Sequence, residues 1–189
     1  TKFSCMINHS LENHFLIAMP GLTDPRFSQS VTYVCEHNEG GAMGIMINQP
    51  AKLSYKELFE QLQLNDDYND ESPLLLGGPV QKERGFVLHS SEKQWTSTLS
   101  VSDDIALTGS KDILDDIANH QGPKNVLIAL GYAGWDAGQL EEEIVQNSWL
   151  TVPAEKHIIF DTPLDKRWTS AAKQLGIDLA LMSSQAGHA

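Results

Sequence analysis

The stretch that most constrains the fold runs from residue 126 to residue 150 and joins an apolar, a glycine-rich and an amphipathic segment. Residues 126–130 form an uninterrupted apolar run, which is typical of a strand covered on both faces. Asp136 and Gln139 have the spacing of a capping box, which satisfies free N–H groups at a helix start. The stretch therefore predicts a buried strand, a turn through Gly131, Gly134 and Gly138, and a helix that begins at Asp136.

A glycine-rich turn before a helix has two interpretations, phosphate binding and close packing. The spacing G-x-x-G-x-x-x-G matches neither the dinucleotide-binding nor the P-loop pattern. Residues 125–155 contain no Lys or Arg, and Asp136 with three consecutive glutamates at 141–143 would repel a phosphate at the helix start. We therefore favour a packing role for the glycines and expect the carboxylates to face water.

Length and composition indicate one globular domain that covers residues 1–189, with a loose or partly helical lead-in at 1–13 and a mobile tail at 182–189. The net charge of −12 opposes broad contact with nucleic acid or an anionic membrane. The apolar run at 15–19 is too short for a signal-peptide core or a membrane span, so we expect a cytoplasmic protein. Cys5 and Cys35 are too few for a disulfide framework, and no cofactor is expected.

Strands and helices alternate along the chain, which predicts an α+β protein whose sheet could curl into a barrel-like core. Helices are expected from Ser54, from Ser110, from Asp136 and from Thr162–Pro163, the last with Leu175 on its buried side. Strands are expected at residues 15–19, 30–37, 42–48, 74–76, 85–89, 98–101, 105–107, 126–130, 149–152 and 157–160.

Cys35 and two histidines are the candidates for chemistry. Cys35 alternates with Val31 and Tyr33, which favours a small buried side chain with a raised thiol pKa over a reactive thiolate that His37 would assist. His37 and His89 each end a strand and could meet a glutamate, but the seven histidines show no compact metal-binding spacing. We therefore predict no metal site.

Gly77 and Gly78 precede Lys82 and Arg84, the one place where flexible backbone and positive charge lie close together in sequence. Successive N–H groups there could form an anion-binding nest, although a tight turn beside a solvated charged loop is the favoured interpretation. The tryptophans are expected to be core and interface rings, and Trp135 is the one placed nearest to a pocket.

Several motifs in the right order make the chain resemble the AlgH/YqgE family over nearly its full length, at residues 15–27, 30–50, 74–80, 85–90 and 130–150. This resemblance implies a single α+β domain with a mixed, bifurcated sheet that curls toward a pseudo-barrel and has flanking helices. Family members are often labelled transcriptional regulators, and the family supplies no catalytic residue or cofactor to carry over. The motif positions are candidates for a shared surface: Gly77, Gly78, Pro79, Val80, His89, Gly131, Trp135, Gly138, Gln139 and Glu143.

Direct DNA binding would require a basic recognition helix, whereas the best-defined helices carry acidic runs. Only the segment with Lys166, Arg167 and Lys173 offers three positive charges. The sequence thus leaves two hypotheses. The first is a regulatory binding protein that contacts a protein or small-molecule partner through Gly77, Gly78, Pro79, His89, Trp135 and Gln139. The second is a small-molecule-binding protein or enzyme with a site near Cys35, His37 and His89.

Overall fold

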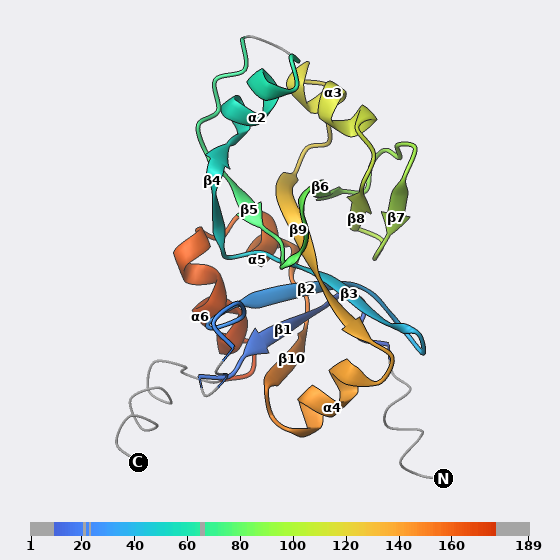
Figure 1. Ribbon diagram of the computed structural model, residues 1–189, viewed down its shortest axis with the longest axis vertical. Coiled ribbons are helices and arrows are strands. Elements are labelled where there is room, and N and C mark those ends of the chain that lie inside the picture. The colour runs from blue at the N-terminus through green and yellow to red at the C-terminus, as the bar shows by residue number, and fades with distance from the viewer. Residues whose placement is uncertain (1–9, 21, 23, 65–66, 177–189) are drawn as a thin grey trace.

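The computed structural model describes residues 10–20, 22, 24–64 and 67–176, and in these the strands form one ten-stranded sheet with short helices around it (Figure 1). The strand order is β10-β1-β2-β3-β9-β6-β8-β7, and β4 and β5 branch from this path. The strands are β1 (His14–Ala18), β2 (Val31–Asn38), β3 (Gly41–Met46), β4 (Pro50–Ser54), β5 (Pro73–Leu76), β6 (Val80–Ser90), β7 (Thr98–Ser100), β8 (Ile105–Thr108), β9 (Val126–Asp136) and β10 (Trp149–Pro153).

The long strand β9 divides the sheet into two branches. Its first half pairs with β6 on one edge, in antiparallel register from His89↔Val126, and with β5 on the other edge, in parallel register at Leu75↔Ala129. Its second half pairs with β3, for example at Gly44↔Ala133. Because β5 and β3 occupy successive parts of the same edge of β9, the sheet bifurcates there. This confirms the expected mixed, bifurcated α+β sheet.

The glycine-rich segment after residue 130 is strand rather than turn, which corrects the sequence-based prediction. Antiparallel pairing with β3 and β6 supplies hydrogen-bond partners here, so β9 continues to Asp136. Gly131 has φ +74°, and a Cβ there would lie less than 3.0 Å from the carbonyl oxygens of Gly78 and Val80. The glycine therefore allows a neighbouring segment to approach closely, as the packing interpretation required.

The helix expected from Asp136 is α4 (Gln139–Val145), preceded by the left-handed Gly138. Only one half of the capping box forms, since the Gln139 Oε1 accepts the Asp136 N–H at 2.9 Å while no side chain caps the helix. The start of α4 is thus set by Gly138 and by the Gln139 side-chain amide, which accepts the Asp136 N–H.

Two of the other helices follow their sequence signals. α2 (Tyr55–Gln61) begins at Ser54, whose hydroxyl accepts the Glu57 N–H at 3.1 Å, and Phe59 is fully buried. α3 (Asp112–Ala118) buries Ile113 and Ile117. These amphipathic helices cover the branch formed by β4, β5, β6 and β9, and Figure 1 places both beyond the end of β9 where this strand begins.

The C-terminal region departs from the prediction in two respects. Residues 157–160, expected as a strand, belong to helix α5 (Lys156–Phe160), in which Ile158 and Ile159 are both buried. A short apolar run does not distinguish a strand from a buried helical turn, because each buries adjacent side chains. After the 3-10 turn η1 (Leu164–Lys166), α6 (Arg167–Lys173) buries Ala172 but leaves Leu175, expected inside, exposed beyond its end.

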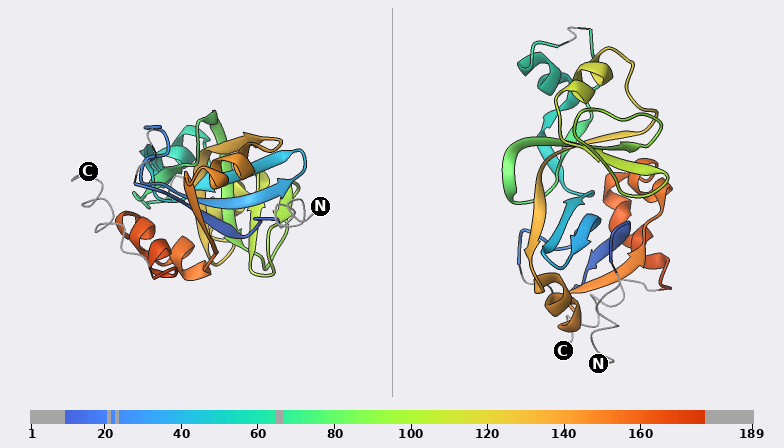
Figure 2. Two further views of the ribbon diagram at one scale, coloured as in Figure 1. Left: turned by 90° about the horizontal axis from the view of Figure 1, so that it is seen from below. Right: turned by 90° about the vertical axis from the view of Figure 1, so that its right-hand side faces the viewer.

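The core lies in three clusters that the curled sheet keeps apart. The largest fills the hollow of the sheet with residues of β1, β2, β3, β6 and β8, and α5 and α6 close it on one side (Figure 2). A second lies under α2 and α3, and a third packs α4 against β9 and β10. The curled sheet forms half a barrel with flanking helices, which agrees with the expected curl toward a pseudo-barrel.

Two boundaries differ from the sequence-based expectation. Residues 10–13 are attached to β2, since the Asn13 N–H donates to the Val34 carbonyl at 2.9 Å and Leu11 packs on the third cluster; residues 1–9 and 182–189 lie outside the described residues. The charged segment before Gly85 is part of β6, whose pairing with β9 is irregular between Val80 and Gly85.

Candidate functional site

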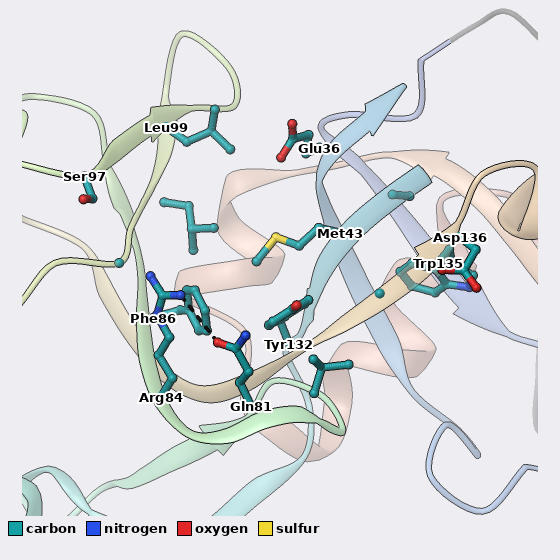
Figure 3. A pocket seen from close by; sticks show the side chains of 15 residues that line it. Glu36, Met43, Gln81, Arg84, Phe86, Ser97, Leu99, Tyr132, Trp135 and Asp136 are labelled. Carbon is teal, nitrogen blue, oxygen red and sulfur yellow. Dashed lines mark hydrogen bonds between the residues drawn. The ribbon is translucent and has the colours of Figure 1, made fainter. Parts of the chain in front are cut away.

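An open groove of about 640 Å³ lies between the two branches of the sheet (Figure 3). A cavity of this volume falls in the range that accommodates small molecules and short peptide segments. β2, β3 and β9 form one wall, and β6, β7 and β8 form the other. The lining residues of this groove are Glu36, Ala42, Met43, Val80, Gln81, Arg84, Phe86, Ser97, Leu99, Leu107, Gly109, Tyr132, Gly134, Trp135 and Asp136.

Arg84 provides the positive charge of the groove. Its guanidinium lies over the Phe86 ring at 4.9 Å from the centroid, and its Nη1 donates to the Gln81 Oε1 at 3.4 Å (Figure 3). Tyr132 packs edge-on against Phe86, with 5.6 Å between centroids. Since no carboxylate pairs with Arg84 in the part of the chain that the structure describes, the guanidinium is held on an aromatic platform and remains available to an anion.

Glu36 and Asp136 place negative charge in the same groove, away from Arg84 (Figure 3). Both residues are exposed, and neither forms an ion pair within the described ranges. Met43 lies between Arg84 and these two carboxylates, and Leu99, which is 40% exposed, faces the same groove. The groove therefore has a positive end, an apolar middle and a negative side.

The glycines of the 77–80 motif pack the β5–β6 connection against β9. The Gly77 N–H donates to the Leu130 carbonyl and the Gly77 carbonyl accepts the Met46 N–H, both at 2.8 Å. A Cβ at Gly78 would lie less than 3.0 Å from the backbone of Tyr132. The Gly77 N–H is thus occupied and unavailable to an anion, and Arg84 turns into the groove instead. This arrangement favours the tight-turn interpretation over the nest.

Pro79 is half-buried in the same connection, directly before Val80, which lines the groove. Lys82 is exposed and does not line it. Of the two positive charges that follow the glycine pair in the sequence, only Arg84 belongs to the groove.

Trp135, Gln139 and Glu143 form one local network at the start of α4. The Glu143 Oε1 accepts the indole N–H of Trp135 at 3.0 Å and that of Trp149 at 2.9 Å, while its Oε2 accepts the Gln139 amide at 2.9 Å. Trp135 and Trp149 are 6% and 3% exposed. Glu143, expected to face water, thus fastens α4 to β9 and β10, and Trp135 also lines the groove.

Cys35 is buried within the largest cluster, and its Sγ lies 3.7 Å from the Tyr33 carbonyl oxygen. Burial raises the pKa of the Cys35 thiol far above its usual range, and the nearby Glu36 adds to this shift. The thiol is therefore protonated at neutral pH, as expected from its apolar neighbours.

His37 is buried at the end of β2 and joins three parts of the chain. Its Nδ1 accepts the Leu11 N–H at 2.9 Å, so its Nε2 carries the proton and donates to the Glu141 Oε1. Glu141 is half-buried, which corrects the expectation that the three glutamates all face water. The pair fixes the lead-in segment and α4 to β2.

His89 is fully buried at the far end of β6 in a chain of hydrogen bonds. Its Nδ1–H donates to the Ser90 carbonyl at 2.8 Å, and its Nε2 accepts from the Thr108 hydroxyl at 2.7 Å. Thr108 in turn accepts from the Thr98 hydroxyl at 2.8 Å, and the ring packs edge-on against Trp95. Burial lowers the pKa of His89, so the ring is neutral at pH 7.

Cys35, His37 and His89 therefore have separate surroundings, and none lines the groove. Within the described ranges, no three side chains of His, Cys, Asp or Glu are placed to hold a metal ion. Of the motif positions, Val80 and Trp135 line the groove, while Gly77, Gly78, Pro79 and Gln139 shape the segments next to it.

Arg167 is a buried cation that the sequence gave no reason to expect. It is 5% exposed, its Nη1 donates to the Ile47 carbonyl and its Nε donates to the Thr162 carbonyl at 2.9 Å. Burial lowers its pKa, and Tyr55 opposes this shift. Arg167 therefore joins α6 to the segment after β3 and is not part of a basic surface.

The AlgH-like family model matches residues 15–180. The chain belongs to the AlgH-like family. A UPF0301 protein of Saccharophagus degradans is 59% identical over 95% of this chain and 89% of that protein. Another from Thioalkalivibrio sulfidiphilus is 57% identical over 94% of this chain and 96% of that protein. The family resemblance stated from the motifs is thus confirmed.

Two solved structures share the fold. The solution structure of the AlgH protein from Pseudomonas aeruginosa has a TM-score of 0.77 and 49% identity, and the match covers 95% of this chain and 96% of that one. A crystal structure of a Corynebacterium diphtheriae protein has a TM-score of 0.73 at 17% identity, over 93% of each chain, so it supports the fold alone. None of the described helices is long and apolar enough to cross a membrane.

Proposed function

We propose that this AlgH-like protein is a binding protein whose partner or ligand occupies the groove between the two branches of the sheet. The observation that supports this most directly is Arg84, an exposed guanidinium that rests on Phe86 and has no carboxylate partner among the described residues. Held in this way, it loses little side-chain freedom when an anion binds, which favours recognition.

A regulatory role would then operate through this groove rather than through DNA. The net charge of −12 opposes contact with phosphate backbones. Arg167, one of the three positive charges near α6, is buried against backbone carbonyls. The enzyme hypothesis has no comparable support, because Cys35 and His89 are buried in complete local networks.

The test is capture of binders from a bacterial cell extract with matched surface variants, analysed by mass spectrometry for both proteins and small molecules. Leu99→Lys fills the groove with a charged side chain, whereas Val145→Lys changes a 74% exposed residue of α4 that does not line the groove. We expect Leu99→Lys to lose a binder that wild type and Val145→Lys retain. Binding that survives Leu99→Lys, or is lost only in Val145→Lys, would refute the proposal.

A further inference from the structure

The groove is bordered by a sheet edge that can accept another strand. β7 ends the strand order of the described residues, in which it pairs with β8 on one side only. The Ser97 carbonyl accepts the Gly109 N–H at 3.1 Å and the Val101 N–H donates to the Ile105 carbonyl at 3.0 Å. Antiparallel pairing alternates, so the backbone groups of Thr98 and Ser100 point outward, away from β8. An added strand would find its hydrogen-bonding partners there.

The side chains of β7 connect this edge with the groove. Ser97 and Leu99 line the groove, whereas the Thr98 hydroxyl contacts Thr108 on the opposite face. Residues directly opposite each other in paired strands place their side chains on the same face. An added strand would therefore direct every second side chain into the groove, and the residues between them would lie opposite Thr98 and Ser100.

The charges fix the direction of such a strand. The Ser97 end of β7 lies at Arg84, because Ser97 bonds Gly109 and the Arg84 guanidinium is the nearest side-chain group to a Cβ placed on Gly109, at 3.2 Å. The other end leads to Val101, which packs on the cluster that contains Tyr33 and Cys35, next to Glu36 in β2. Arg84 and Glu36 thus lie toward opposite ends of β7.

We propose that the groove binds an extended peptide segment that adds antiparallel to β7, with a basic residue near its N-terminal end, apolar residues in the middle and an acidic residue near its C-terminal end. The antiparallel direction places the basic residue at Glu36 and the acidic residue at Arg84. This inference rests on the proposed function and adds the chemical class and orientation of the partner.

The probe is a short blocked peptide, acetyl-Lys-Thr-Leu-Thr-Phe-Thr-Glu-amide, whose Lys, Leu, Phe and Glu share one face when it is extended. Binding is followed by fluorescence anisotropy and by ¹⁵N NMR shifts. We expect the reversed sequence, Glu-Thr-Phe-Thr-Leu-Thr-Lys with the same blocked ends, to bind about tenfold more weakly, because it places like charges together at both ends. Equal binding of both sequences would refute the assigned direction.

Variants of the protein test the positive end. Arg84→Gln is expected to weaken binding of the probe peptide about tenfold, because it removes a charge-assisted hydrogen bond. Lys82→Gln removes the same charge from an exposed residue of β6 outside the groove and should leave binding unchanged. An equal effect of the two substitutions would indicate attraction by overall charge and would overturn the proposal.

N-methylation of the peptide tests strand addition without altering the protein. A methyl group on the nitrogen of the central Thr, a residue opposite the outward backbone of β7, should abolish binding. The same group on the Leu nitrogen points away from β7 and should have little effect. Equal tolerance at both positions would exclude strand addition. If all peptides fail while Leu99→Lys still removes a captured binder, the peptide inference fails and the proposed function stands.

Discussion

Replacement of Glu143 by Ala tests whether one carboxylate fixes α4 to the sheet. Its Oε1 accepts two indole N–H groups, from Trp135 and Trp149, and its Oε2 accepts the Gln139 amide. Both tryptophans are buried, so loss of the acceptor leaves two buried donors without the partner that the fold provides.

The magnitude follows from the number and kind of these bonds. A hydrogen bond to a charged group contributes about 1.5–3 kcal/mol. Glu143 itself is half-buried, so water can reach part of the vacated site, and the two bonds share one oxygen and are not additive. We therefore expect Glu143→Ala to lower the free energy of unfolding by about 2–4 kcal/mol. Glu143→Gln, which keeps a neutral acceptor, should cost about half as much.

Urea denaturation followed by tryptophan emission measures this effect and also reports the surroundings of Trp135 and Trp149. The matched control is Glu142→Ala, which changes an exposed carboxylate of the same helix whose one hydrogen bond, from Gln146, is 3.5 Å long. It should change the free energy of unfolding by less than about 0.5 kcal/mol. Comparable losses in Glu142→Ala and Glu143→Ala would refute the reasoning and assign the effect to helix propensity.

Three further predictions test other contacts. Gly78→Ala should lower the free energy of unfolding by about 3 kcal/mol or more, because the added Cβ would clash with the backbone of Tyr132. Gly85→Ala is the control and should have little effect, since nothing lies within 4 Å of a Cβ placed there. Equal urea midpoints for the two variants would contradict this prediction. Burial lowers the pKa of His89, so the unfolded chain is protonated first as the pH falls, and stability should decrease below pH of about 6.5. His89→Gln should flatten that dependence, and an imidazolium NMR signal at neutral pH would refute the assignment. In a Cys5→Ser background, Cys35 should react with a thiol reagent only after denaturation; rapid labelling of the native protein would reopen a nucleophilic role.

Local sequence signals predicted most of the elements correctly. The Ser54 cap begins α2, and the apolar run from residue 126 is the start of β9. These features depend on neighbours within a few residues, so their physical cause is contained in the local sequence. The motifs at residues 15–27, 30–50 and 130–150 also identified the family.

Features that depend on distant partners were not available from local patterns. β9 continues through Gly131 and Gly134 because β3 and β6 supply hydrogen bonds from remote parts of the chain. Residues 157–160 form α5 rather than a strand, since the sheet accommodates Ile158 and Ile159 as one helical turn. The residues of β9 and α5 do not by themselves reveal these distant partners.

The candidate site shows the same division. The sequence singled out Trp135 and Arg84, yet it placed Arg84 in a solvated charged loop beside a glycine turn, because nearness in the chain was the only guide to its neighbours. The groove is assembled from five strands and the end of β2, so its lining could not be inferred before the sheet was known.

The sequence by itself determined the α+β class, the family, the acidic charge and the burial of Cys35, because composition, motifs and short-range periodicity encode them. Only the tertiary structure decided that His37 contacts Glu141, that Arg167 is buried and that Arg84 and Glu36 face one groove. These pairings join residues far apart in the chain, and the curl of the sheet around β9 sets which of them meet.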